Sequence, residues 1–95
     1  MILRNERNGE DFTVPPEGAR LGRDPSLELP FPEDDDVVSG THCRVVFRDD
    51  AWWLEDLGST NGTFVNGARV ATARLSPGDR LQVGRVELVA LRDQD

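Results

Sequence analysis

The sequence contains no lysine and no tyrosine, and it has a single cysteine, Cys43, and a single histidine, His42. One cysteine excludes an internal disulfide framework and a cysteine-ligated metal cluster. A lone histidine beside a lone cysteine does not make a typical zinc site either. The glycine-rich segment 57–67 lacks the Gly-Lys-Ser/Thr ending of a P-loop. We therefore expect neither a metal ion nor a cofactor.

An excess of positive charge is also missing. The formal net charge is −7 and the isoelectric point is about 4.6, which disfavours nucleic acid and anionic membrane surfaces as partners. No apolar run follows Met1 that could serve as a signal or a membrane span, so we expect a cytoplasmic protein without membrane insertion. All eleven basic residues are arginine, which is a weak indication of a bacterial source. Any bound anion must be held locally, by arginine forks.

Sustained helical periodicity is absent, whereas period-two alternation recurs with turn signals every eight to twelve residues. This pattern is typical of an all-β sandwich or barrel. Its strongest turn signal is Asn66-Gly67, because both central residues of a type I′ turn need positive φ angles. The 95 residues are enough for one domain, 1–95. About ten or eleven short strands are expected, and those that can be placed cover residues 2–4, 12–14, 20–22, 27–29, 43–48, 52–56, 63–65, 68–70, 81–83 and 86–91.

The clearest hairpin joins segments 43–48 and 52–56. Alternation puts Cys43, Val45 and Phe47 on one face of the first of these strands. It also sends one of Trp52 and Trp53 into the core and the other to the opposite face. We favour this packing over a carbohydrate-binding tryptophan platform, because aromatic cross-strand pairs are common in sheets.

Segment 24–36 contains three prolines and ends in the acidic run Glu33-Asp34-Asp35-Asp36. We expect an exposed loop here, with one short strand at 27–29. The acidic run has two interpretations, a solvated surface or a charge screen that selects partners. It lacks the spaced ligands and the glycine of a calcium loop.

A catalytic site is not expected. Ser39 lies three residues before His42, but side chains at that spacing in an extended chain face opposite ways. A Ser-His nucleophile would need a special turn and an orienting acid. The protein is therefore predicted not to be an enzyme.

Small hydrogen-bond donors occur in three predicted loops: Arg23, Ser39-Gly40 and the segment 59–62. A guanidinium, hydroxyls, loop amides and a carboxamide suit a phosphate group and the backbone beside it. The same residue types are also ordinary turn formers. The residues alone leave both interpretations open.

The order and spacing of several motifs resemble the forkhead-associated (FHA) domain family. The matching blocks are Gly22-Arg23, then Ser39-x-x-His42, then the segment 56–67 with its Ser-Thr-Asn-Gly-Thr and Asn-Gly sequences, and finally Gly78-Asp79 with Gly84. The resemblance implies an eleven-stranded β-sandwich of the SMAD/FHA type with binding loops at one end. It also implies a non-catalytic phosphothreonine-peptide recognition module, acting as an adaptor in Ser/Thr kinase signalling. Its partner would be a phosphothreonine-containing protein, either a Ser/Thr kinase or a kinase substrate.

The resemblance also assigns roles to individual residues. Arg23 and Ser39 would bind the phosphate, Thr60 would place its hydroxyl and amide at the phosphothreonine, Asn61 would hold the peptide main chain, and Gly40 would offer its backbone amide. A second group of residues would support the site structurally, with the His42 imidazole bracing the loops and Gly62 permitting a special backbone shape. This group consists of Gly22, His42, Gly62, Asn66 and Gly67.

The sequence departs from a common family pattern at Gly40-Thr41, where many members carry basic residues. A missing cation weakens binding of a dianion, although charged hydrogen bonds from Arg23 can compensate. The same fold could also serve as a phospho-independent interaction or oligomerisation module. In the family, the loop that holds the acidic run helps to select the residue about three places after the phosphothreonine. We therefore expect acidic residues to be disfavoured at that place, through like-charge repulsion.

Overall fold

The computed structural model describes residues 1–31 and 37–92, and within them eleven β-strands and no α-helix occur. Alternating apolar residues favour strands because each strand gains one face to bury. The prediction of an all-β fold is confirmed. The strands are β1 (Ile2–Asn5), β2 (Asp11–Thr13), β3 (Ala19–Gly22), β4 (Leu29–Pro30), β5 (Cys43–Arg48), β6 (Ala51–Asp56), β7 (Thr63–Val65), β8 (Ala68–Val70), β9 (Thr72–Leu75), β10 (Arg80–Val83) and β11 (Val86–Leu91).

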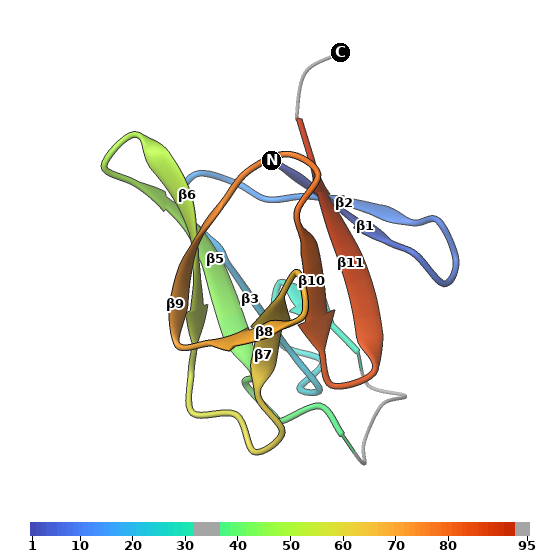
Figure 1. The fold of residues 1–95 in the computed structure, drawn as a ribbon. Helices are drawn as coiled ribbons and strands as arrows, with labels where there is room; N and C mark the ends of the chain where they lie inside the picture. Colours follow the sequence, from blue (N-terminus) through green and yellow to red (C-terminus); the bar gives the residue numbers. More distant parts are fainter. Residues whose placement is uncertain (32–36, 93–95) are drawn as a thin grey trace.

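Two sheets form a sandwich (Figure 1). The six-stranded sheet has the order β2-β1-β11-β10-β7-β8, and the five-stranded sheet has the order β4-β3-β5-β6-β9. All neighbouring strands in the described residues are antiparallel except β3 and β4, which are parallel. The eleven-stranded sandwich implied by the family resemblance is therefore confirmed. The described part of the chain contains no helix capable of crossing a lipid bilayer.

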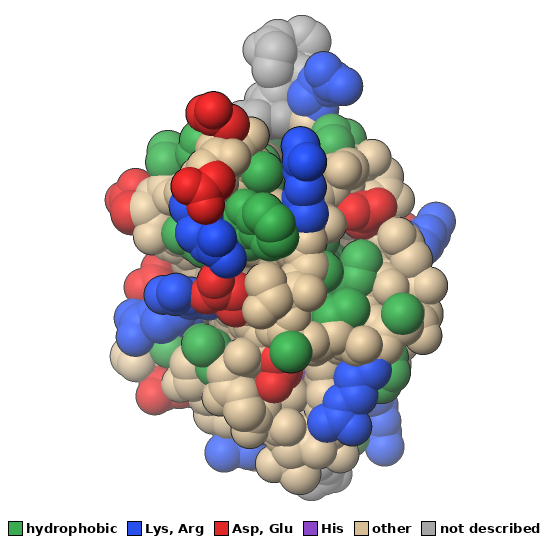
Figure 2. All heavy atoms as spheres, turned by 60° about the vertical axis from the view of Figure 1, so that its left-hand side comes forward, with side chains coloured by type: hydrophobic (Ala, Val, Ile, Leu, Met, Phe, Trp, Pro, Cys, Tyr) green, Lys and Arg blue, Asp and Glu red, His purple; other side chains and the backbone are tan. Residues whose placement is uncertain are grey.

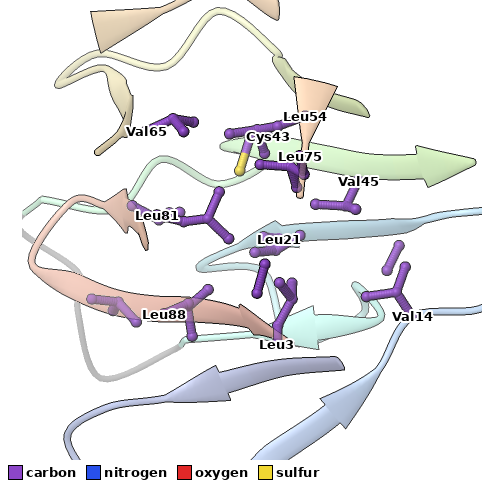
Figure 3. Close-up of a cluster of buried hydrophobic side chains, with 14 of the residues drawn as sticks. Leu3, Val14, Leu21, Cys43, Val45, Leu54, Val65, Leu75, Leu81 and Leu88 are labelled. Atoms are coloured by element: carbon purple, nitrogen blue, oxygen red, sulfur yellow. The ribbon is translucent and has the colours of Figure 1, made fainter. Parts of the chain in front are cut away.

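Apolar side chains from the inner faces of both sheets fill the space between them (Figure 3). Leu3, Leu81 and Leu88 come from the six-stranded sheet, whereas Leu21 and Leu54 come from the five-stranded sheet; each is at most 1% exposed. Burial of one such side chain stabilises the fold by about 1.5 to 3 kcal/mol. This core fixes the position of the two sheets, and thereby of the loops at their ends.

Strand β9 is not predicted by the sequence pattern, because only Ala73 and Leu75 of its four residues are apolar. Pairing with β6 creates it: Leu75 lies opposite Trp52, and Ala73 lies opposite Leu54. The sequence pattern does not predict β9 because the hydrogen bonds that form it come from β6, which lies about twenty residues earlier in the chain.

The predicted short strand at 27–29 is displaced. The strand observed here, β4, covers only Leu29 and Pro30 and pairs in parallel with β3. Leu27 instead belongs to a turn, in which its amide donates to the carbonyl of Asp24 at 3.1 Å, and its side chain is buried. The acidic run 33–36 lies outside the described residues.

The hairpin of β5 and β6 has the predicted faces. Trp52 packs against the core, and its ring meets that of Phe47 edge-on, with 5.2 Å between the ring centroids. Phe47 occupies the predicted face but stays 41% exposed, because it lies near the end of β5, beyond the buried part of the sheet. Trp53 lies on the opposite face, where the Arg48 guanidinium carbon sits 4.7 Å from its ring centroid.

Two tight turns confirm how local backbone preference sets the hairpins. Asn66 and Gly67, with φ angles of 51° and 86°, join β7 to β8 as a two-residue turn. Asp49 and Asp50, with φ angles of 52° and 62°, join β5 to β6 in the same way. Positive φ at both central residues is the property of a type I′ turn. The hairpin predicted at Asn66-Gly67 is therefore confirmed.

Candidate functional site

Four connections meet at one end of the sandwich, shown at the bottom of Figure 1. They are the link β3–β4, residues 37–42 of the link β4–β5, the link β6–β7 and the turn β10–β11. Hydrogen bonds join the first two: the Arg23 amide donates to the Ser39 carbonyl at 2.9 Å, and the Asp24 amide donates to the Gly40 carbonyl at 3.1 Å. Segments distant in sequence therefore form one continuous surface at this end.

Gly22 makes this contact between loops possible. A Cβ atom at Gly22 would overlap the carbonyl oxygen of Gly40 and would lie 2.9 Å from its carbonyl carbon. Only glycine lets the end of β3 approach the β4–β5 connection so closely. The supporting role assigned to Gly22 thus corresponds to a specific backbone contact.

Ser39, Thr60 and Asn61 are brought together across two loops. The Thr60 amide donates to Ser39 Oγ at 3.0 Å, and Asn61 Nδ2 donates to the Val37 carbonyl at 3.0 Å. Ser39 Oγ therefore accepts one bond and keeps its own hydrogen for donation to a ligand. The Thr60 amide is occupied by Ser39, so the exposed hydroxyl is the group that Thr60 can offer. The Asn61 side-chain nitrogen is held by the Val37 carbonyl, so Asn61 Oδ1 is the group that can accept a hydrogen bond from a ligand.

His42 braces the same two loops from beneath. It is fully buried, its Nδ1 accepts from the Ser39 amide at 3.1 Å, and its Nε2 donates to the Gly62 carbonyl at 2.8 Å. These partners require the tautomer with hydrogen on Nε2. Both ring nitrogens bond to the backbone rather than to Ser39 Oγ, so the imidazole positions the loops and does not activate the hydroxyl.

Arg23 brings a positive charge to this surface. Its side chain is partly buried, and Nη1 donates to the Val38 carbonyl at 3.3 Å. Nη2 lies 4.0 Å from the position that a Cβ atom would take on Gly40. The guanidinium therefore lies over the connection that carries Ser39 and Gly40. A charged fork next to a hydroxyl donor is a suitable arrangement for a phosphate group.

Asp56 organises the β6–β7 connection, and the sequence analysis assigns it no role. Its carboxylate accepts from the Gly58 amide at 3.0 Å, the Ser59 amide at 3.1 Å, Ser59 Oγ at 2.5 Å and Thr63 Oγ1 at 2.7 Å. Burial opposes ionisation, but the hydrogen bonds from Ser59 and Thr63 outweigh it and lower the pKa of Asp56 below its ordinary value. An aspartate two residues before a glycine is a known turn signal, which could have identified it.

The remaining supporting residues differ in their placement. Gly62 has a φ of 89° and receives the His42 bond, so it belongs to the site. Asn66 and Gly67 lie at the far end of β7, where the Asn66 side chain bonds to Asp79 and to the Arg80 amide. The structure does not bring this turn to the loops, and it can support the site only by fixing the β7–β8 hairpin.

The described ranges 1–31 and 37–92 contain neither a metal-ligating cluster nor a reactive thiol. No group of three or more His, Cys, Asp or Glu side chains in these ranges is arranged to hold a metal ion. Burial raises the pKa of the Cys43 thiol to about 12, so the thiol stays protonated and unreactive. The site offers hydrogen bonds and charge, which are the properties of a binding surface.

Comparison with known proteins gives a consistent result. The sequence model of the FHA domain matches residues 19–84. The FHA domain-containing protein FhaB of Mycobacterium tuberculosis is 36% identical over 91 residues, covering 93% of this chain and 56% of FhaB. The oxoglutarate dehydrogenase inhibitor of Corynebacterium jeikeium is 33% identical over 91 residues, covering 96% of this chain and 62% of the inhibitor. The chain thus spans less than two thirds of the length of these relatives.

Solved structures share the whole fold. An FHA domain determined in work on phosphothreonine-dependent FHA domain interactions superimposes with a TM-score of 0.89 at 27% sequence identity, covering 99% of this chain and 97% of that domain. The match includes both sheets, so the resemblance is not restricted to the motifs. From the family model, the relatives and the fold together, it follows that this chain belongs to the FHA domain family.

Proposed function

We propose that residues 1–95 form one non-catalytic module that binds phosphothreonine peptides and serves as an adaptor in Ser/Thr kinase signalling. The observation that carries the proposal is the convergence of Arg23, Ser39, Thr60 and Asn61 on one surface, through hydrogen bonds between loops. Membership in the FHA family supports it, as does the phosphothreonine dependence of the interactions studied for the similar solved domain.

The chemistry of each group follows from the bonds that it already makes. Arg23 supplies charge-assisted hydrogen bonds to the phosphate, and each is worth about 1.5 to 3 kcal/mol. Ser39 donates its hydroxyl hydrogen to a phosphate oxygen while still accepting from Thr60. Gly40 would add its backbone amide as a further donor. Asn61 Oδ1 accepts from a peptide amide, with the side chain held in place by the Val37 carbonyl.

The partner in this proposal is a phosphothreonine-containing protein, either a Ser/Thr kinase or a protein that such a kinase modifies. The oxoglutarate dehydrogenase inhibitor is named for the regulation of another protein, which is consistent with a role through binding rather than catalysis. We also propose a cytoplasmic location for the protein, in which it would meet such phosphorylated partners.

A titration against a phosphothreonine peptide library tests the proposal, with unphosphorylated peptides of the same sequences as controls. Wild type should bind phosphorylated peptides selectively, and Arg23→Ala should lose at least about tenfold in affinity, one charged hydrogen bond being worth more than 1.4 kcal/mol. Arg74→Ala is the matched control, because Arg74 is an exposed arginine on β9. Binding should also weaken below the second phosphate pKa of about 6.

Two outcomes would contradict the proposal. The first is that no phosphopeptide binds better than its unphosphorylated control. The second is that Arg23→Ala and Arg74→Ala bind equally well. A protein-binding activity that persists without phosphate would instead favour a phospho-independent interaction or oligomerisation module on the same fold.

A further inference from the structure

A second arginine lies at the edge of the recognition loops. Arg69 belongs to β8 and stands opposite Phe64 in the β7–β8 hairpin. Its side chain runs toward Gly62: Nε lies 2.8 Å, Cζ 3.1 Å and Cδ 3.2 Å from the position that a Cβ atom would take on that glycine. The absence of a side chain at Gly62 therefore provides the space for the Arg69 guanidinium, one residue from Asn61.

The charge of Arg69 is not compensated within the described residues. Most other arginines on the strands form ion pairs there with carboxylates, whereas Arg69 is exposed and forms none. The paired arginines are Arg4, Arg20, Arg44, Arg48 and Arg80. Figure 2 shows arginine side chains on both sides of the lower, loop-bearing end of the molecule. A solvent-facing guanidinium at this end keeps its hydrogen-bond donors for an incoming anion.

Arg69 approaches the loops from a different direction than Arg23. Arg23 follows β3 of the five-stranded sheet, whereas Arg69 lies on β8, at the edge of the six-stranded sheet. The β10–β11 turn at Gly84 contacts Val37 on the other side of β7. Because β7 lies between β8 and β10, Arg69 is about two strand spacings from this turn, a distance on the order of 10 Å.

The distance from the phosphate-binding groups limits what Arg69 can contact. Gly62 lies two residues after Thr60, so their Cα atoms are at most about 7 Å apart. The guanidinium next to Gly62 is thus on the order of 10 Å from Thr60. An extended peptide advances about 3.3 Å per residue, so this separation corresponds to roughly two to four residues.

We propose that Arg69 is a specificity-determining residue, which binds the carboxylate of an Asp or Glu located within four residues of the phosphothreonine. The inference rests on the proposed phosphothreonine binding and adds a preference to it. Arg69 supplies near the site a cation that is missing at Gly40-Thr41. An acidic peptide would gain a charge-assisted hydrogen bond on the side of Gly62 that faces away from the β10–β11 turn. Val37, which follows the acidic run 33–36 in the sequence, lies on the opposite side, at the β10–β11 turn.

The test is an acidic scan of one bound phosphothreonine peptide, with Glu placed in turn at each position from four before to four after the phosphothreonine. Affinities are measured by fluorescence anisotropy for wild type, Arg69→Gln and Arg69→Glu. Arg69→Gln retains an extended polar side chain over Gly62, and Arg74→Gln is the matched control. Wild type should gain about three- to tenfold from Glu at one position, Arg69→Gln should lose that gain, and Arg69→Glu should be weakened by Glu there.

The possible results distinguish a failure of the proposed role of Arg69 from a failure of the proposed phosphothreonine binding. If wild type discriminates phosphorylated from unphosphorylated peptide, but the scan is the same for wild type, Arg69→Gln and Arg69→Glu, the role of Arg69 is overturned and phosphothreonine binding stands. If Arg74→Gln alters the scan as much as Arg69→Gln, the effect is general electrostatics and the inference also fails. Absence of any phosphate discrimination in wild type would overturn both.

Discussion

The contact between Gly22 and Gly40 provides a direct test of the site's architecture through Gly22→Ala. The added methyl group would overlap the Gly40 carbonyl oxygen and lie 2.8 Å from Leu27 Cδ1. Leu27 can rotate away, but the Gly40 peptide is held by a bond from the Asp24 amide at 3.1 Å. The substitution must therefore displace the connection that carries Ser39.

The expected magnitude follows from what has to move. Inserting a methyl group into a tightly packed position costs about 1 to 3 kcal/mol. Weakening the two backbone bonds between Arg23 and Ser39 and between Asp24 and Gly40 adds about 1 kcal/mol. Gly22→Ala should thus lower the free energy of unfolding by about 2 to 4 kcal/mol. For a domain of this size, that corresponds to a fall in Tm of about 10 to 25 °C.

Urea denaturation of the wild type, Gly22→Ala and Gly40→Ala measures this effect. Gly40→Ala is the control because the nearest atom to its new methyl group is Arg23 Nη2 at 4.0 Å, and its φ angle is not positive. Phosphopeptide affinity should fall further in Gly22→Ala than in the control, since Ser39 is displaced. The reasoning is refuted if the two alanine variants unfold at the same urea concentration and bind equally well.

Two further predictions concern acidic residues, namely Asp56 and the run 33–36. Asp56→Asn should lower the free energy of unfolding by about 1 to 3 kcal/mol at neutral pH, because it removes a charged acceptor of four hydrogen bonds. The pKa of Asp56 is lowered by folding, so its stabilisation is present above the unfolded value of about 4 and is lost as the pH falls through the folded value. Urea titrations of both proteins should therefore converge in acid, and a constant gap down to about pH 2 would contradict this. For the acidic run 33–36, peptide arrays should show that Asp and Glu are disfavoured about three residues after the phosphothreonine, and a preference for them would show the screening hypothesis to be wrong.

The sequence predicts the fold correctly where the structure depends on residues that are adjacent in the chain. Alternation identified nine of the strands and placed a tenth, β4, slightly too early, and Asn66-Gly67 identified a turn, because side-chain alternation and positive φ are properties of a few adjacent residues. Strand β9 could not be predicted from the sequence, because its pairing with β6 outweighs a weak local preference for strand structure. The family motifs, in turn, identified which loops to consider together.

The candidate site divides in the same way. The sequence alone determines which residue types form the site and in what order, and it shows that Gly40-Thr41 departs from the basic residues common in the family. Only the tertiary structure decided that the Thr60 amide bonds to Ser39 Oγ, that His42 joins Ser39 to Gly62, and that the Arg69 guanidinium covers Gly62. These contacts link strands and loops that the core brings together from distant parts of the chain. Their geometry depends on how the two sheets pack, which no short stretch of sequence specifies.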